Sequence, residues 1–158
     1  MGKRFVQGAC AILTLGLGLG LSVALAQDQL AVIKQRQQLM KQQSEGLKAI
    51  QGYVSGQETQ AMAVAKANEL LALSPQIVGL FPTGTSLVEF PGQTHAKPEI
   101  WQQYDRFIDI PVVLRRSEDR LAAAVQNGKK ADVLEVLDTL GRTGCGACHT
   151  LFRAPLQD

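Results

Sequence analysis

The sequence is poor in aromatic residues and in histidine, and neither sign of charge is in clear excess. Aromatic side chains make up 5% of the 158 residues, and the formal net charge is +2. Without Lys3 and Arg4, fourteen basic and fourteen acidic residues remain. Proteins that bind nucleic acid present a basic face, so this balance gives no reason to expect a nucleic-acid partner.

The chain also lacks any sustained alternation of apolar and polar residues with a period of two, which is the pattern of half-buried strands. Alanine, leucine, glutamine and charged residues dominate instead. These residue types favour helices over sheets, and we therefore expect an all-α fold.

The first 26 residues have the layout of a secretory signal. Lys3 and Arg4 precede an uncharged apolar run that ends in the small-residue triplet Ala24-Leu25-Ala26. This layout predicts cleavage before Gln27 and export to the periplasm, with an uncleaved membrane anchor as the alternative. Cys10 would leave with the signal. The mature chain, residues 27–158, is long enough for one domain and has no stable membrane span.

Four helical segments can be drawn in the mature chain. A spacing of three and four residues predicts the first over residues 28–52, with Met40 on its apolar face. The second covers residues 57–73 and ends before Pro75. The third covers residues 98–127, with a kink or break expected at Pro111. The fourth covers residues 130–153.

A connection with four prolines separates the second helix from the third, while the other connections are short. Long loops in compact domains often mark a crossover or a functional lid. Four helices with one long loop are typical of an antiparallel four-helix bundle, which is the architecture we predict.

One short motif carries recognisable chemistry. Cys145, Cys148 and His149 form a CxxCH sequence near the end of the fourth helix. A redox dithiol would sit at a helix start in a βαβ setting, and no strand pattern is present here. A structural zinc site needs four ligands, and the mature chain offers only one further histidine, His95, in the long loop.

A c-type haem needs only what this motif contains. Two thiols three residues apart can bond to the two vinyl groups of one porphyrin edge, and the adjacent histidine can bind the iron. The sequence therefore predicts one covalent haem c, attached through Cys145 and Cys148, with His149 as the proximal iron ligand.

The position of the motif points to a family. The CxxCH motif comes near the carboxyl terminus, after three other helical segments. Three stretches succeed one another along the chain: RQQLMK at 36–41, KPEIW at 97–101 and CGACHTLFR at 145–153. In this the mature chain resembles the cytochrome c′ family, the class II c-type cytochromes, which are four-helix bundles. The resemblance implies a bundle with a haem near its carboxyl end.

The resemblance also implies which residue faces the distal side of the iron, opposite the proximal histidine. In five-coordinate family members an apolar residue covers that side, and in low-spin relatives a methionine binds it, four residues after an arginine. Arg36 and Met40 reproduce this spacing, which makes Met40 the expected distal ligand of a low-spin, methionine-ligated branch. Core filling is the alternative for Met40. Met62 has no comparable support and is expected to pack.

Two arginines have expected roles toward the haem. Arg36 lies one turn before Met40 and could bind a haem propionate, although a single helical arginine is usually solvated or paired with a carboxylate. Arg153 lies one turn after His149, where the family has an arginine beside the proximal histidine. It could also simply be a favourable cation at a helix carboxyl terminus. Trp101 is expected to pack in the bundle.

The sequence shows no catalytic acid, base or nucleophile, so we expect a protein that is not an enzyme. The leading prediction is a periplasmic single-electron carrier with His149 and Met40 on the iron, serving redox partner proteins. The alternative is a five-coordinate cytochrome c′ that binds nitric oxide or carbon monoxide. Family members often dimerise through their first two helices, which makes a homodimer a candidate assembly.

Overall fold

The computed structural model describes the backbone of residues 17–156 and the side chains of residues 27–156. The signal prediction rests on Lys3, Arg4 and the triplet at 24–26. The two cations and Cys10 lie outside the described residues, as do the side chains of the triplet. Cleavage before Gln27 therefore stays a prediction.

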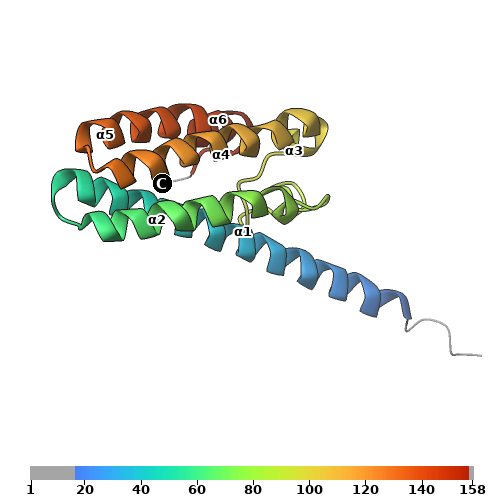
Figure 1. The fold of residues 1–158 in the computed structure, drawn as a ribbon. Helices are drawn as coiled ribbons and strands as arrows, with labels where there is room; N and C mark the ends of the chain where they lie inside the picture. The colour runs from blue at the N-terminus through green and yellow to red at the C-terminus, as the bar shows by residue number, and fades with distance from the viewer. Residues whose placement is uncertain (1–16, 157–158) are drawn as a thin grey trace, which may run out of the picture.

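The first helix, α1, is longer than its apolar periodicity predicted. It runs from Leu17 to Ser55 and begins inside the predicted signal. Its amino-terminal part projects beyond the other helices (Figure 1). Gly56 ends it with φ 84° and donates its N–H to the Tyr53 carbonyl at 3.1 Å. Only glycine adopts this left-handed conformation without steric cost, which is why the helix stops here.

The second helix, α2, covers Gln60–Leu73, because Thr59 caps it by accepting the Met62 N–H at 3.1 Å. It ends before Pro75, as predicted. Two short 3₁₀ turns follow, η1 at Ser74–Gln76 and η2 at Val78–Leu80. Ser74 is buried against α4, so this turn belongs to the core of the bundle.

The long loop folds back on the carboxyl end of the chain. Lys97 N–H donates to the Phe152 carbonyl at 2.9 Å, and Ala154 N–H donates to the His95 carbonyl at 2.8 Å. These bonds surround an isolated antiparallel bridge between Ala96 and Arg153. The loop therefore lies beside the CxxCH segment.

The predicted third helix is divided into α3, Glu99–Gln102, and α4, Tyr104–Asn127. The division falls at Gln103, whose φ of −122° and ψ of 45° lie outside the helical region. A break at Pro111 is therefore wrong: α4 continues through that residue. Phe107 before the proline and Leu114 after it are both buried, and this packing holds the two halves of α4 in one helix.

The predicted fourth helix is one helical run with a wider turn inside it. It consists of α5, Lys130–Thr139, the π-helical segment η3, Leu140–Cys145, and α6, Gly146–Phe152. A Cβ atom at Gly144 would lie 3.0 Å from Leu114 Cδ1, and one at Gly146 would lie 2.9 Å from the Gly141 carbonyl oxygen. Glycine at position 144 thus permits close contact between η3 and α4, and glycine at position 146 permits the π turn, a feature that often occurs at functional sites.

The helices form the predicted antiparallel four-helix bundle. The helix α1 packs on α2 and α5, while α4 packs on α2 and α5 (Figure 1). One cluster of buried side chains contains residues from α1, α2, α4 and α5. Its members include Leu39, Ile50, Leu70, Leu121, Val125 and Val133. Among the residues that the structure describes, no helix combines the length and apolar character needed to cross a bilayer.

Candidate functional site

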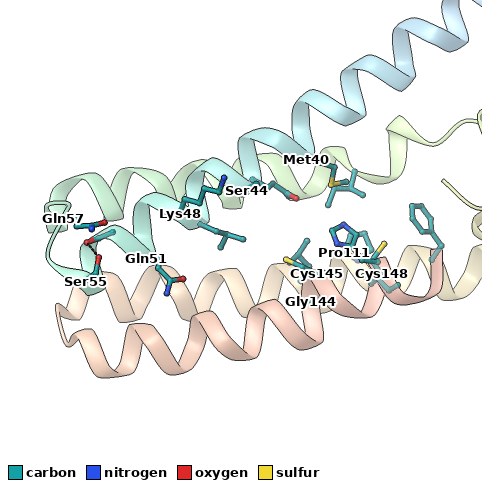
Figure 2. Close-up of a pocket in the computed structure, with 18 residues that line it drawn as sticks. Met40, Ser44, Lys48, Gln51, Ser55, Gln57, Pro111, Gly144, Cys145 and Cys148 are labelled. Carbon is teal, nitrogen blue, oxygen red and sulfur yellow. Dashed lines mark hydrogen bonds between the residues drawn. The ribbon is translucent and has the colours of Figure 1, made fainter. Parts of the chain in front are cut away.

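The CxxCH segment lines a cavity between α1 and the carboxyl half of the chain. This cavity has a volume of about 420 Å³, within the range of ligand pockets. A second cavity of about 370 Å³ adjoins it. Figure 2 shows Met40 on α1 facing across this space toward the helical run that carries Cys145 and Cys148. Both cavities are lined by Met40, Ser44, Cys148 and His149.

The two thiols are half-buried and not joined by a disulfide. Burial, and after it the Glu118 carboxylate, raises the pKa of Cys145. Burial, and after it Cys145, raises the pKa of Cys148 to about 11. Reactive dithiols have lowered thiol pKa values, so both cysteines differ from a redox pair in their electrostatics.

The His149 imidazole is half-buried beside these thiols, at the wall of both cavities. Burial lowers its pKa, and the positive charge of Arg153 lowers it further. The neutral ring is the form that binds metal ions. The site therefore offers an imidazole that is ready for ligation at neutral pH.

Met40 is half-buried, and its side chain packs against the hydrophobic core cluster. It is the methionine that the structure brings to the cavities, whereas Met62 lies 43% exposed on α2. The sulfur of Met40 is thus placed on the wall of the cavity opposite the CxxCH segment. Ligation of the iron by this thioether stays a prediction.

Arg36 has surroundings that the sequence did not indicate. Its side chain is 3% exposed, which excludes the solvated alternative. The guanidinium donates to Thr85 Oγ1 at 2.9 Å, to the Thr85 carbonyl oxygen at 2.6 Å and to Thr94 Oγ1 at 2.6 Å. It also lies 4.8 Å from the centre of the Phe81 ring. Burial lowers its pKa to about 10, so it stays charged at neutral pH and lines the second cavity.

Arg153 follows α6 directly and is exposed. Its N–H donates to the His149 carbonyl at 3.2 Å. Its charge lowers the pKa values of both His149 and Cys148. The predicted neighbourhood of Arg153 and the histidine is therefore present. Trp101 packs against the core as predicted, and its Nε1 donates to the Phe81 carbonyl at 3.0 Å.

Sequence reasoning missed Glu118, which is 2% exposed on α4. Ser74 donates a hydrogen bond to its Oε1 at 2.5 Å, and its buried Oε2 has no partner in the part of the chain that the structure describes. A signal was present in the sequence, because Glu118 lies between Leu114 and Leu121 at the spacing of one helix face. That face turns inward, so the carboxyl is buried with it.

These residues fit a covalently attached haem. Two protonated thiols and a neutral imidazole stand on one wall of an apolar cavity of ligand size. Fully buried Phe107 lies at the wall of the first cavity. Within residues 17–156, no group of three histidine, cysteine or acidic side chains is arranged to hold a bare metal ion.

The comparisons with known proteins agree on one family. The family model described as cytochrome C' matches residues 31–153. Cytochrome c' of Pararhodospirillum photometricum is 31% identical over 124 residues, which cover 78% of this chain and 96% of that protein.

Solved structures show the same relationship. Cytochrome c' from Thermochromatium tepidum is 25% identical, with a TM-score of 0.72 and coverage of 80% of this chain and 97% of the other. The nitric oxide complex of a leucine-to-isoleucine variant of cytochrome c prime from Alcaligenes xylosoxidans is 25% identical, with a TM-score of 0.67 and coverage of 78% and 94%.

The family decides between the three chemistries that CxxCH allowed, because its members carry a covalent haem c and are haem-binding carriers, not classical enzymes. The chain belongs to the cytochrome c′ family, and its cofactor is a single covalently bound haem c.

Proposed function

We propose that the protein binds a diatomic gas, nitric oxide or carbon monoxide, at a five-coordinate haem c. In this proposal Cys145 and Cys148 hold the haem by thioether bonds, and His149 is the proximal ligand. Met40 covers the opposite side of the iron without binding it. The observation that carries the proposal is the membership of the cytochrome c′ family, together with the apolar cavity that His149 and Met40 line. The nitric oxide complex of the Alcaligenes relative supports it.

The side chains have distinct tasks in this site. When bound, the haem supplies an iron that exchanges one electron and accepts a small ligand. The neutral His149 ring offers its lone pair, and the positive charge of Arg153 keeps the ring neutral by disfavouring its protonation. Apolar side chains around the cavity, among them Leu47 and Phe107, keep water from a bound gas.

Arg36 is proposed to bind a propionate in addition to its threonine partners. A guanidinium carries five N–H donors, and the bonds to Thr85 and Thr94 use one on Nη1 and those on Nη2. Donors on Nε and Nη1 remain for a carboxylate. Because Arg36 lines the second cavity together with His149, a propionate there would lie within the same enclosure.

A second candidate is a single-electron carrier in which Met40 binds the iron from the distal side. Its support is the position of Met40 at both cavities that His149 lines. A thioether is a soft ligand that stabilises ferrous haem and raises the potential. The partners of such a carrier would be redox proteins of the periplasm.

The optical and electron paramagnetic resonance spectra of the ferric protein separate these candidates. Gas binding predicts a high-spin ferric spectrum, and the ferrous protein should bind carbon monoxide faster in Met40→Ala than in the wild type. Met40→Leu should leave the spin state unchanged. A low-spin spectrum with a far-red sulfur-to-iron band that Met40→Leu abolishes would establish the carrier instead. Met62→Leu on exposed α2 is the matched control.

Export to the periplasm is part of the proposal and has a separate test. The basic start and the triplet at 24–26 support cleavage before Gln27. Haem-loaded protein from the periplasmic fraction should therefore have Gln27 as its first residue. Recovery of full-length protein with the membranes would support the anchor. Sedimentation of the same sample would determine whether the candidate homodimer forms.

A further inference from the structure

A carboxyl group is buried in the bundle close to the CxxCH segment. Glu118 on α4 is 2% exposed, and its Oε2 has no hydrogen-bond partner among the described residues. A buried carboxylate with one unsatisfied oxygen is costly, because burial penalises the charged form. The charge on Glu118 is therefore sensitive to any change of charge nearby.

Glu118 lies directly behind the wall of the first cavity. Leu114, one turn earlier on α4, lines that cavity together with Gly144 and Cys145. A Cβ at Gly144 would lie 3.0 Å from Leu114 Cδ1, so α4 and η3 are in close contact here. The Glu118 carboxylate also raises the pKa of the Cys145 thiol, an effect second to burial. Glu118 thus acts electrostatically on the residue that anchors the haem.

The hydrogen bonds around Glu118 accommodate both of its protonation states. The Ser74 hydroxyl lies 2.5 Å from Glu118 Oε1 and 3.3 Å from the Leu70 carbonyl oxygen. When the carboxylate is ionised, Ser74 donates to it. When the carboxyl is protonated, Oε1–H can donate to Ser74, which then turns to donate to Leu70. Gln43 Nε2 donates to Ser74 Oγ at 3.4 Å and fits either arrangement.

The charged and ionisable groups around Glu118 come from two elements, α4 and η3. Arg115 and Asp119 on α4 shift its pKa in opposite directions, and Cys145 is the ionisable group facing it from η3. The turn η1 presents Ser74, α2 presents the Leu70 carbonyl and α1 presents Gln43. Desolvation is the largest cause and raises the pKa of Glu118 to about 7.

We propose that Glu118 is a proton site coupled to the oxidation state of the haem, taking up one proton when the haem is reduced. One electron arrives from a soluble one-electron reductant, and one proton passes from water to the Glu118 carboxylate. When the haem is oxidised, the electron and the proton both leave. Reduction removes one positive charge from the site, so the carboxylate loses an attraction and binds a proton more tightly. The inference rests on the proposed attachment of haem at Cys145, whichever residue faces the distal side.

The test is the midpoint potential of the haem-loaded protein as a function of pH, in the wild type, Glu118→Gln and Glu135→Gln. Glu135 is an exposed carboxylate on α5 and serves as the matched control. The wild-type potential should fall as pH rises through the neutral range. A tenfold difference in proton affinity between the oxidation states corresponds to about 59 mV for one electron. Glu118→Gln should lose this fall, while Glu135→Gln should keep it.

Infrared difference spectra give a second readout. Reduction of the wild type should produce the carbonyl band of a protonated carboxyl, and that band should be missing in Glu118→Gln. If Glu118→Gln does not retain haem, Ser74→Ala replaces it. The Ser74 hydrogen bond lowers the Glu118 pKa, so its loss should move the fall in potential to higher pH.

Two results would overturn the coupling. In one, the midpoint potential of Glu118→Gln depends on pH as the wild-type potential does. In the other, the fall in potential occurs at the same pH in Ser74→Ala as in the wild type. A failure of the proposed covalent haem attachment would give a different result from a failure of the coupling. It would appear as haem that acidified acetone extracts from the wild type, since a thioether-bound haem stays with the protein.

Discussion

The Arg36 guanidinium on α1 donates to Thr94 Oγ1 at 2.6 Å, across 58 residues of sequence. Together with its bonds to Thr85, this contact joins the first helix to the long loop. Met40 lies one turn after Arg36 on the same helix. The position of Met40 at the cavity therefore depends on how the loop is held.

Replacing Arg36 by methionine should destabilise the haem-loaded protein. Hydrogen bonds from charged groups contribute about 1.5–3 kcal/mol each, and part of this would be recovered by apolar packing on Phe81. We expect the free energy of unfolding in urea to fall by about 2–4 kcal/mol. Arg106→Met is the control, because Arg106 is exposed and its guanidinium donates a hydrogen bond to the Gln103 side chain within its own helical region. If Arg36→Met and Arg106→Met lose the same unfolding free energy, the hydrogen bonds of Arg36 do not stabilise the fold.

Glu118 should make the protein less stable as pH rises. Its pKa in the folded protein is raised to about 7, above the value of about 4.3 for an unperturbed glutamate. Between these values the folded state binds more protons than the unfolded state, so stability falls as pH rises. Because one pKa unit corresponds to about 1.4 kcal/mol, the full effect is about 3–4 kcal/mol. Urea unfolding at acidic and alkaline pH should show this loss in the wild type.

The Glu118→Gln variant tests the origin of that loss. The amide does not ionise, so its unfolding free energy should change less between the two pH values than that of the wild type. The exposed Glu135→Gln variant should behave as the wild type does. If the unfolding free energy of Glu118→Gln changes with pH as much as that of the wild type, the effect belongs to other groups.

Local patterns in the sequence predicted the features that short stretches encode. The spacing of Cys145, Cys148 and His149 within one helical run places them together, and Ser74-Pro75 ends α2 because proline restricts the residue before it. The break that the sequence allowed at Pro111 does not occur. There the penalty of an internal proline is outweighed by the buried side chains on both halves of α4.

Contacts across the fold could not be predicted in this way. The partners of Arg36 lie in a loop without periodicity, so nothing local indicates that Thr85 and Thr94 meet it. Glu118 sits on an apolar stripe, but its bond to Ser74 depends on how α2 and η1 pack on α4. The role of Met40 stays a prediction, because both ligation and packing require the same position.

Phe107 should be a major contributor to stability. Its ring is fully buried and meets the rings of Phe81 and Phe152 edge-on, at centroid distances of 5.0 and 5.7 Å. Phe107→Ala should lower the free energy of unfolding by about 3–5 kcal/mol. Val113→Ala on the exposed side of α4 should cost less than about 1 kcal/mol. Thermal unfolding followed by circular dichroism measures both, and a small effect at Phe107 would mean that the cavity wall collapses to fill the gap.

The two glycines of η3 at positions 141 and 144 should respond in opposite ways to alanine. A Cβ at Gly144 would lie 3.0 Å from Leu114 Cδ1 and 3.3 Å from Leu140 Cδ1, whereas one at Gly141 would meet nothing within 4 Å. Gly144→Ala should therefore cost about 1–3 kcal/mol through overpacking. Gly141→Ala should gain up to about 1 kcal/mol, because alanine is the better helix former.

Thermal unfolding and the fraction of chains that carry haem measure the difference between these two variants. Adding Leu114→Val to Gly144→Ala shortens the side chain that the new Cβ would meet, so it should restore part of the lost stability. If the two alanine variants unfold at the same temperature, close packing between η3 and α4 does not hold the CxxCH segment in place. If only Gly144→Ala loses both stability and haem, the contact with Leu114 positions the cysteines for attachment.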